Sequence, residues 1–245
     1  MVLNMQETKS VFSYTLTKAK DGAVPVIIVS AGSSSRMGGL NKQFLQICGV
    51  PVIARTLRVF EKSPFISRII LVAREDNIPD MQLIAQKYGI EKITDIVAGG
   101  NQRRDSVMCG LEKLTSDEKK VLIHDGARPF ADDVLIENAV AALENNDACV
   151  CAVKVIDTIK RADDEKIVTA TVDRENLYSV QTPQGVNVPK YLEAISRFPD
   201  DTVTDDASLM EKAGYIVKIV DGNRKNIKIT TPDDINFAEI IVRGE

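Results

Sequence analysis

A run of small residues interrupted by two cations has the composition of a polyphosphate cradle. The run reads Ser30-Ala31-Gly32-Ser33-Ser34-Ser35-Arg36-Met37-Gly38-Gly39-Leu40-Asn41-Lys42-Gln43. Small side chains let backbone N–H groups approach phosphate oxygens, and Arg36 and Lys42 add positive charge. The second and third glycines of a dinucleotide-binding fingerprint are missing, as is the Gly-Lys-[Ser/Thr] of a Walker A loop. Taken alone, the run is either an anion cradle or a surface loop with two solvated cations.

A second polar stretch is His124-Asp125-Gly126-Ala127-Arg128-Pro129, which ends an apolar run. Asp125 at such a position can hold a metal ion or a sugar hydroxyl, and Arg128 can bind a phosphate through two parallel hydrogen bonds. A local ion pair between the two is the competing interpretation. We interpret His124, the only histidine, as a buried ring with satisfied hydrogen bonds in preference to an acid/base catalyst.

A third stretch, Gly99 to Ser106, opens a predicted helix. Its exposed N–H groups can receive a base or ribose, with Asp105 or Ser106 as a capping residue, although a plain helix start fits equally well. Three further residues, Thr158, Arg174 and Lys228, lie outside these stretches. Taken alone, each is interpreted as a solvated cation or as an ordinary strand residue. With one histidine, a nucleophilic triad is not expected.

Strands must bring these stretches to one edge of a sheet. Buried-strand signals occur at residues 24–29, 69–72, 93–97, 121–123 and 148–155, with helical patterns between them at 51–60, 81–85, 106–111 and 135–143. Alternation of strand and helix predicts an α/β fold, a doubly wound, mostly parallel, Rossmann-like sheet. Ligands of such sheets bind at the carboxyl ends of the strands, where the polar stretches begin.

The pattern changes near Asp157. Residues 157–182 alternate polar and apolar side chains with no crossover helix, which predicts an antiparallel β-arm that projects from the sheet. A lone hairpin is marginal in water, so a second copy of the chain could cover it. Further helices are predicted at 189–197, 206–213 and 232–242, and strands at 216–220 and 226–229. We expect a single domain over residues 24–245, preceded by a loosely held extension at 1–23.

Composition narrows the class of protein. The 31 Lys+Arg and 35 Asp+Glu residues give a formal charge of −4, so no overall attraction to nucleic acid or an anionic membrane is expected, and any phosphate site must be local. The four cysteines lack metal-ligand spacing, and Cys149 and Cys151 are expected in the core. No apolar run approaches 18 residues. We expect a cytoplasmic protein with reduced thiols.

The motifs together resemble the 2-C-methyl-D-erythritol 4-phosphate cytidylyltransferase family over about residues 24–242. Besides the cradle and the 124–129 stretch, the resemblance rests on Asp157-Thr158-Ile159-Lys160-Arg161, Thr171-Val172-Asp173-Arg174, Gln181-Thr182-Pro183-Gln184, Thr204-Asp205-Asp206-Ala207-Ser208 and Asn226-Ile227-Lys228-Ile229-Thr230. It implies a nucleotidyltransferase that moves CMP from CTP to 2-C-methyl-D-erythritol 4-phosphate with Mg²⁺, in non-mevalonate isoprenoid biosynthesis.

The resemblance also implies roles for residues. Those implied as catalytic are Arg36, Lys42 and Lys228, and those implied to bind nucleotide are Ala31, Gly32, Gly100, Asn101, Ser106 and Asp125. Asp125 is also the implied metal ligand, with Mg²⁺ held largely by the CTP phosphates. Arg128, Thr158, Arg174 and Thr182 are implied to bind the acceptor. Thr158 and Arg174 would reach from one subunit's arm into the neighbour's site, which implies a homodimer.

Three alternatives remain at this level. A ribitol 5-phosphate cytidylyltransferase is similar in fold and CTP loop, and the segments 157–161 and 173–174 favour the methylerythritol enzyme over it. A nicotinamide-dependent dehydrogenase is disfavoured by the missing glycine fingerprint. A non-catalytic nucleotide-binding regulator would be expected to lack Arg174 and Lys228, and both are present.

Overall fold

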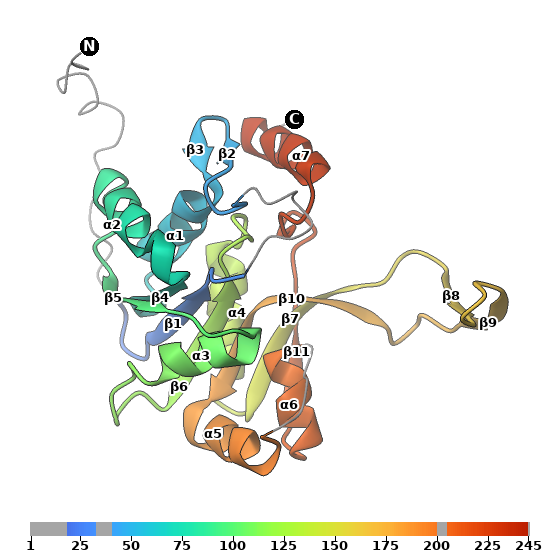
Figure 1. Ribbon diagram of the computed structural model, residues 1–245. Coiled ribbons are helices and arrows are strands. Elements are labelled where there is room, and N and C mark those ends of the chain that lie inside the picture. The colour runs from blue at the N-terminus through green and yellow to red at the C-terminus, as the bar shows by residue number, and fades with distance from the viewer. Residues whose placement is uncertain (1–18, 33–40, 200–204, 245) are drawn as a thin grey trace.

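A seven-stranded sheet forms the centre of the chain in the computed structural model, which describes residues 19–32, 41–199 and 205–244 (Figure 1). Arg36 and most of the 1–23 extension lie outside these ranges. The strands of the central sheet are β1 (Val24–Val29), β4 (Ile66–Ala73), β5 (Ile93–Ala98), β6 (Lys120–Asp125), β7 (Ala148–Lys154), β10 (Tyr178–Asn187) and β11 (Val217–Asp221). The helices are α1 (Val52–Lys62), α2 (Ile78–Lys87), α3 (Arg103–Leu111), α4 (Asp133–Ala142), α5 (Val188–Arg197), α6 (Asp206–Lys212) and α7 (Pro232–Arg243), with a short 3₁₀ turn at Glu75–Asn77.

The strand order is β11-β7-β10-β6-β1-β4-β5. Neighbouring strands are parallel except at β10, which is antiparallel to both β6 and β7. The predicted doubly wound, mostly parallel α/β fold is therefore confirmed. Among the strands of this sheet, sequence reasoning missed β10, because it assigned the start of that strand to the projecting arm. β10 instead lies in the middle of the sheet, with a register irregularity between Val180 and Gln184.

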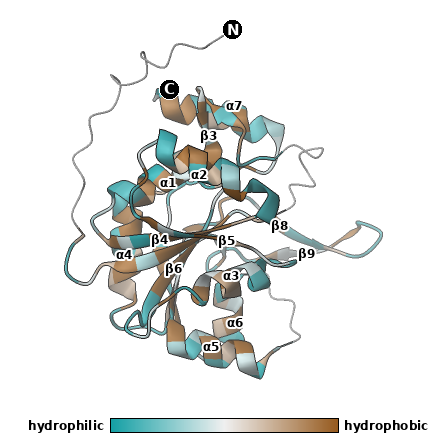
Figure 2. Cartoon of the chain, turned by 60° about the vertical axis from the view of Figure 1, so that its left-hand side comes forward, coloured by the Kyte–Doolittle hydropathy of each residue, from teal (hydrophilic) through white to brown (hydrophobic). Residues whose placement is uncertain are grey.

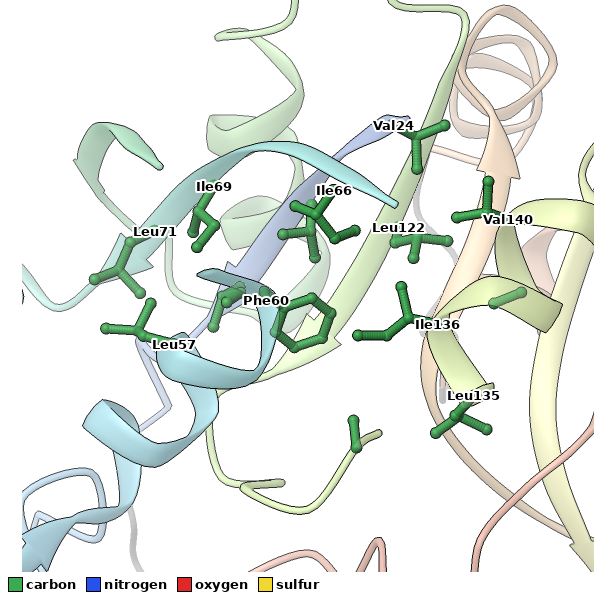
Figure 3. Close-up of a cluster of buried hydrophobic side chains, with 14 of the residues drawn as sticks. Val24, Leu57, Phe60, Ile66, Ile69, Leu71, Leu122, Leu135, Ile136 and Val140 are labelled. Atoms are coloured by element: carbon green, nitrogen blue, oxygen red, sulfur yellow. The ribbon is translucent and has the colours of Figure 1, made fainter. Parts of the chain in front are cut away.

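Both faces of the sheet are covered by helices, as the alternation along β1 shows. Val26 and Ile28 face a core shared with α1, α2 and α4, in which Phe60 and Leu57 are fully buried (Figure 3). Ile27 points the other way, into a core shared with α3, α5 and α6. The hydrophobic strands between these helices stand out in Figure 2. No helix in the described ranges is both long enough and apolar enough to cross a membrane.

A third, smaller cluster fixes the segment that carries Lys228. The hairpin of β2 (Gln46–Ile47) and β3 (Val50–Pro51) contacts α7, and Ile47, Ala127 and Ile229 are buried together there. The predicted strand at 226–229 is wrong, because this segment joins no sheet. Individual hydrogen bonds hold it instead. In one of them the N–H of Ile229 donates to Ala127 O at 2.8 Å. Lys228 is thereby placed beside the end of β6.

The projecting arm is present as a two-stranded antiparallel hairpin, β8 (Ile159–Ala162) and β9 (Val168–Val172). It extends away from the body of the molecule, far from the flanking helices (Figure 1). Its predicted end at residue 182 runs too far, since residues 178–180 already pair with β7. Ile156, Ile167 and Val168 at the arm are 61%, 59% and 57% exposed. The described part of the chain thus leaves more than half of the surface of each of these apolar side chains uncovered.

Candidate active site

A cavity of about 340 Å³ opens at the carboxyl ends of β1, β4, β5 and β6. Its described lining comprises Val29, Ala31, Gly32, Lys42, Gln43, Arg74, Gly100, Asn101, Gln102, Arg103, Ser106, Asp125, Ala127 and Lys228. Four of these side chains are cationic, and one is a carboxylate. The chain as a whole is negative, whereas the described lining of this cavity carries more positive than negative side chains, as a local phosphate site requires.

Asp125 is the electrostatic centre of the cavity. Its Oδ2 lies 2.6 Å from Lys228 Nζ and 3.9 Å from Arg128 Nε, and its Oδ1 lies 3.6 Å from Arg103 Nε. Burial of the carboxyl opposes ionisation, but Lys228 and Arg103 outweigh burial and hold the pKa of Asp125 well below its usual range. Asp125 is therefore a permanent anion at physiological pH.

Hydrogen bonds between β6 and β10 fix the backbone of Asp125. Its N–H donates to Thr182 Oγ1 at 3.0 Å, and the Thr182 oxygen lies 3.1 Å from His124 Nδ1. The other ring nitrogen, Nε2, lies 3.0 Å from Arg128 O, which can only accept. His124 therefore carries its proton on Nε2, and its Nδ1 accepts a hydrogen bond from the Thr182 hydroxyl. The ring is fully buried, and burial lowers the pKa of His124 to about 4.

Arg128 lies behind the cavity wall. It is mostly buried, and its Nη1 donates to Asn226 O at 2.7 Å. Burial lowers the pKa of its guanidinium, against the opposing charge of Asp125. Arg128 and Thr182, both predicted to bind the acceptor, thus lie next to Asp125 without lining the cavity themselves. Their direct contact with an acceptor stays a prediction.

The start of α3 forms the opposite wall. Asp105 accepts from the N–H of Gln102 at 3.0 Å, so the carboxylate caps the helix as the sequence indicated. Ser106 Oγ donates to Gln102 O at 3.1 Å while lining the cavity. A Cβ atom on Gly100 would lie 2.3 Å from Asp105 Cβ, which excludes any larger residue without a shift of the loop. Gly100, Asn101 and Ser106 are therefore brought together at one place.

The cradle is described at both of its ends. Ala31 and Gly32 line the cavity directly after β1, and Lys42 and Gln43 line it from the returning segment. Ser30 anchors the strand end by donating its hydroxyl to Val72 O at 2.8 Å. Residues 33–40 between the two ends, Arg36 among them, lie outside the described ranges. Lys42, Asp125 and Lys228 thus line one cavity, and their roles in binding and catalysis stay predictions.

Thr158 and Arg174 lie apart from these residues. Both belong to the arm, neither lines the cavity, and Arg174 Nη1 donates to Ile156 O within the arm. Sequence reasoning gave no role to two other residues that do line the cavity, Arg74 and Arg103. Arg74 follows β4 and was open to the same carboxyl-edge argument as Asp125. Arg103 is held by an ion pair with Asp206, far away in sequence, which no local pattern reveals.

The fold and the site define a class of protein. A doubly wound α/β sheet whose carboxyl-edge cavity combines small residues, several cations and one carboxylate is arranged to bind a nucleotide and to stabilise charge on its phosphates, as nucleotidyltransferases do. A sequence profile of the 2-C-methyl-D-erythritol 4-phosphate cytidylyltransferase family matches residues 24–244. The chain belongs to this family.

Relatives and solved structures agree with this assignment. The 2-C-methyl-D-erythritol 4-phosphate cytidylyltransferase of Alkaliphilus oremlandii is 44% identical over 222 residues, covering 89% of this chain and 94% of that protein. The protein of the same name from Bacillus mycoides is 45% identical over 217 residues, covering 87% and 95%. The crystal structure of 4-diphosphocytidyl-2C-methyl-D-erythritol synthase from Anaerococcus prevotii superposes with a TM-score of 0.81 at 34% identity, covering 91% of this chain and 97% of that one.

Proposed function

We propose that the chain transfers CMP from CTP to 2-C-methyl-D-erythritol 4-phosphate, giving 4-diphosphocytidyl-2-C-methyl-D-erythritol and pyrophosphate in isoprenoid precursor biosynthesis. The observation that carries the proposal is the cavity in which Lys42, Asp125 and Lys228 face the start of α3, in a chain of this family. Family membership argues against the dehydrogenase and regulator alternatives, and it does not favour a ribitol 5-phosphate enzyme.

The reaction joins two anions, and repulsion is the main obstacle. Two unit charges of like sign repel by roughly 4 kcal/mol at 4 Å and an effective dielectric near 20, and several charges meet here. A phosphate oxygen of the acceptor attacks the α-phosphorus of CTP, the bond to the bridging oxygen breaks, and pyrophosphate leaves. Lys42 and Lys228, with Arg36 of the cradle, supply the positive charge that stabilises this transfer.

We infer that Mg²⁺ takes part, with Asp125 as its protein ligand. Among the described residues lining the cavity, Asp125 is the sole carboxylate, and no cluster of three potential ligands occurs in the described ranges. One carboxylate with substrate phosphates is a donor set that suits Mg²⁺. The bound ion would neutralise phosphate charge, while Asp125, kept ionised by Lys228 and Arg103, would orient it.

We further infer a homodimer with shared active sites. The arm exposes Ile156, Ile167 and Val168 and carries Thr158 and Arg174 away from the cavity of its own chain. Packing of the arm on a second subunit would cover the apolar residues and bring the polar ones to that subunit's cavity. A two-fold axis would make both sites equivalent.

A reducing, cytoplasmic location completes the proposal. All four cysteines are free thiols. Cys149 and Cys151 are buried in β7, as the sequence predicted, and burial raises the pKa of Cys149 to about 12. A thiol with such a pKa stays protonated and unreactive.

The test is pyrophosphate release with CTP, Mg²⁺ and each candidate acceptor. Product is expected with 2-C-methyl-D-erythritol 4-phosphate, and the diphosphocytidyl alcohol should be identified by mass spectrometry. Ribitol 5-phosphate serves as the control acceptor and should react at least about a hundredfold more slowly, since a site built for one set of hydroxyls leaves polar groups unpaired with another. Equal rates, or preference for ribitol 5-phosphate, would refute the proposed acceptor.

A further inference from the structure

Behind the cavity lies a second carboxylate, Asp206, to which the reaction assigns no role. It is the first residue of α6 and is 1% exposed. Its Oδ1 accepts from the Tyr191 hydroxyl at 2.6 Å, and its Oδ2 lies 2.7 Å from Arg103 Nη1. Asp206 does not line the cavity, so it cannot touch a bound ligand. Any part it plays must act through Arg103.

The position of Asp206 is fixed from two sides. Gln184 of β10 accepts from the N–H of Ala207 at 3.0 Å and donates to Asp205 Oδ2 at 2.8 Å, and thus holds both sequence neighbours of Asp206. Tyr191 of α5 is itself buried, and burial together with the charge of Asp206 raises the pKa of its phenol. The phenol therefore keeps its proton and remains a hydrogen-bond donor to Asp206.

Arg103 is shared between two carboxylates at unequal distances. Burial disfavours its charge, but Asp206 and Asp125 reverse this and raise the pKa of the guanidinium. The contact to Asp206 is 2.7 Å, whereas the contact to Asp125 is 3.6 Å. The closer pair holds the guanidinium back from Asp125, whose other oxygen lies 2.6 Å from Lys228. Asp125 thus remains open to the cavity.

We propose that Asp206, supported by Tyr191, is a positioning residue for nucleotide binding. It anchors Arg103 so that Arg103 lines the cavity without closing onto Asp125. The inference rests on the proposed function, because it concerns the same CTP site. Neutralising Asp206 would leave Asp125 as the only carboxylate near Arg103 in the described structure. The guanidinium would then pair closely with Asp125 and compete with Lys228 for it.

A purely structural role for the ion pair must be separated from this one. Arg104, the next residue, also ties α3 to the α5 region, by donating to Ile195 O at 2.8 Å and Phe198 O at 2.7 Å. Arg104 does not line the cavity. The Arg104→Gln variant is therefore a matched control that loosens the same helix contact without changing charge in the cavity.

The experiment measures CTP affinity by calorimetry in the presence of Mg²⁺, together with KM and kcat, for the full-length protein. Asp206→Asn should weaken CTP binding about tenfold. The factor by which it raises KM for CTP should be larger than the factor by which it lowers kcat. Arg104→Gln should lower the melting temperature yet keep CTP affinity within about twofold of the unmodified protein. Tyr191→Phe, which removes one hydrogen bond from a buried ring, should weaken CTP binding less, by about threefold.

A double-mutant cycle gives a second readout. If Asp206 acts through Arg103, the Arg103→Gln/Asp206→Asn protein should bind CTP no more weakly than Arg103→Gln alone. Unchanged CTP affinity in Asp206→Asn, equal losses in Asp206→Asn and Arg104→Gln, or additive losses in the cycle would each overturn the inference. If Asp206→Asn fails to fold, CTP affinity of Tyr191→Phe is the deciding measurement, and an unchanged affinity would overturn the inference. Absence of CTP-dependent product with the unmodified protein would refute the proposed function instead.

Discussion

The ammonium Nζ of Lys228 lies 2.6 Å from Oδ2 of Asp125, closer than either arginine that shares the carboxylate. The two residues come from distant parts of the chain. The backbone hydrogen bond from Ile229 N–H to Ala127 O holds their segments side by side. Lys228 is 36% exposed toward the cavity, so its charge is available to a ligand as well as to Asp125. We therefore expect this one cation to orient the proposed metal ligand and to bind the acceptor phosphate.

Replacing Lys228 by methionine should damage turnover much more than folding. The free energy of unfolding should fall by about 1–2 kcal/mol, because the buried Asp125 carboxylate loses its closest cation but keeps Arg103 and Arg128 beside it. Turnover should fall about a hundredfold or more, as it does when a charge-stabilising donor is removed. Lys228→Arg keeps the charge and should retain part of the activity. Steady-state kinetics and chemical denaturation of the three proteins check this, and a methionine variant with full activity would contradict it.

Lys42→Ala tests the cradle in the same way. The side chain lines the cavity next to the segment that carries Arg36. Loss of one charge that stabilises the transition state should cost on the order of 3–4 kcal/mol in activation free energy. Lys113→Ala, on an exposed surface away from the cavity, is the control and should behave like the unmodified protein. An unchanged rate of Lys42→Ala at saturating CTP would exclude the assigned role.

Nucleotide choice should favour cytosine. Ser106 Oγ already donates its proton to Gln102 O, so its oxygen can only accept from a ligand in the cavity. The N4 amino group of cytosine donates, whereas O4 of uracil only accepts, and an unpaired buried polar group costs about 1–3 kcal/mol. The kcat/KM for CTP should therefore be clearly higher than that for UTP, and much higher than those for ATP and GTP. Ser106→Ala should narrow the ratio of kcat/KM for CTP over UTP, and comparable rates with ATP or GTP would refute this base site.

How far the sequence alone predicts this site depends on the range of the contacts involved. The loops after β1, β5 and β6 follow apolar runs directly, so Ala31, Gly100 and Asp125 could be placed at one edge from periodicity and the carboxyl-edge rule. The Arg103 to Asp206 pair could not, because its geometry depends on how α3 and α6 pack in three dimensions. The misplaced start of β10 has a related cause. Polar and apolar residues alternate through both the arm and β10, and local alternation does not say which sheet a strand joins.

Burial of His124 should make the folded protein less stable in mild acid. The unfolded chain binds a proton at His124 with a pKa near 6.5, whereas burial holds the folded pKa at about 4. Between these values the unfolded state binds more protons, so stability present above pH 6.5 is lost as the pH falls. From pH 7.5 to 5.5 the free energy of unfolding should drop by about 1.3 kcal/mol on this account. Urea denaturation at the two pH values measures it.

Nitrogen NMR of the same ring provides the control. With one histidine in the chain, the ¹⁵N signals report His124 without ambiguity. The folded protein should show the neutral ring protonated on Nε2, as the contacts to Arg128 O and Thr182 require, with no titration down to pH 5. A folded-state titration near pH 6.5 would show that burial does not hold the ring neutral, and the stability loss would then need another source.

The arm leads to the last prediction, on the oligomer. Residues 157–177 carry Thr158 and Arg174 but leave apolar side chains exposed, and neither polar residue lines the cavity of its own chain. If the arms pack on each other in a C2 dimer, Arg174 acts on the acceptor phosphate in the neighbouring site.

Co-expression of an Arg174→Ala chain with a Lys42→Ala chain should then give heterodimers with one intact site, because both lesions fall in the same pocket and leave the other one whole. Each parent homodimer should be nearly inactive, and the mixture should recover up to about a quarter of normal activity when chains pair at random, since half of the dimers are mixed and each has one working site. Dimer formation is checked by light scattering, and mixed dimers by two affinity tags. Heterodimers as inactive as either parent would show that Arg174 serves its own subunit, and a monomer with full activity would exclude the shared site.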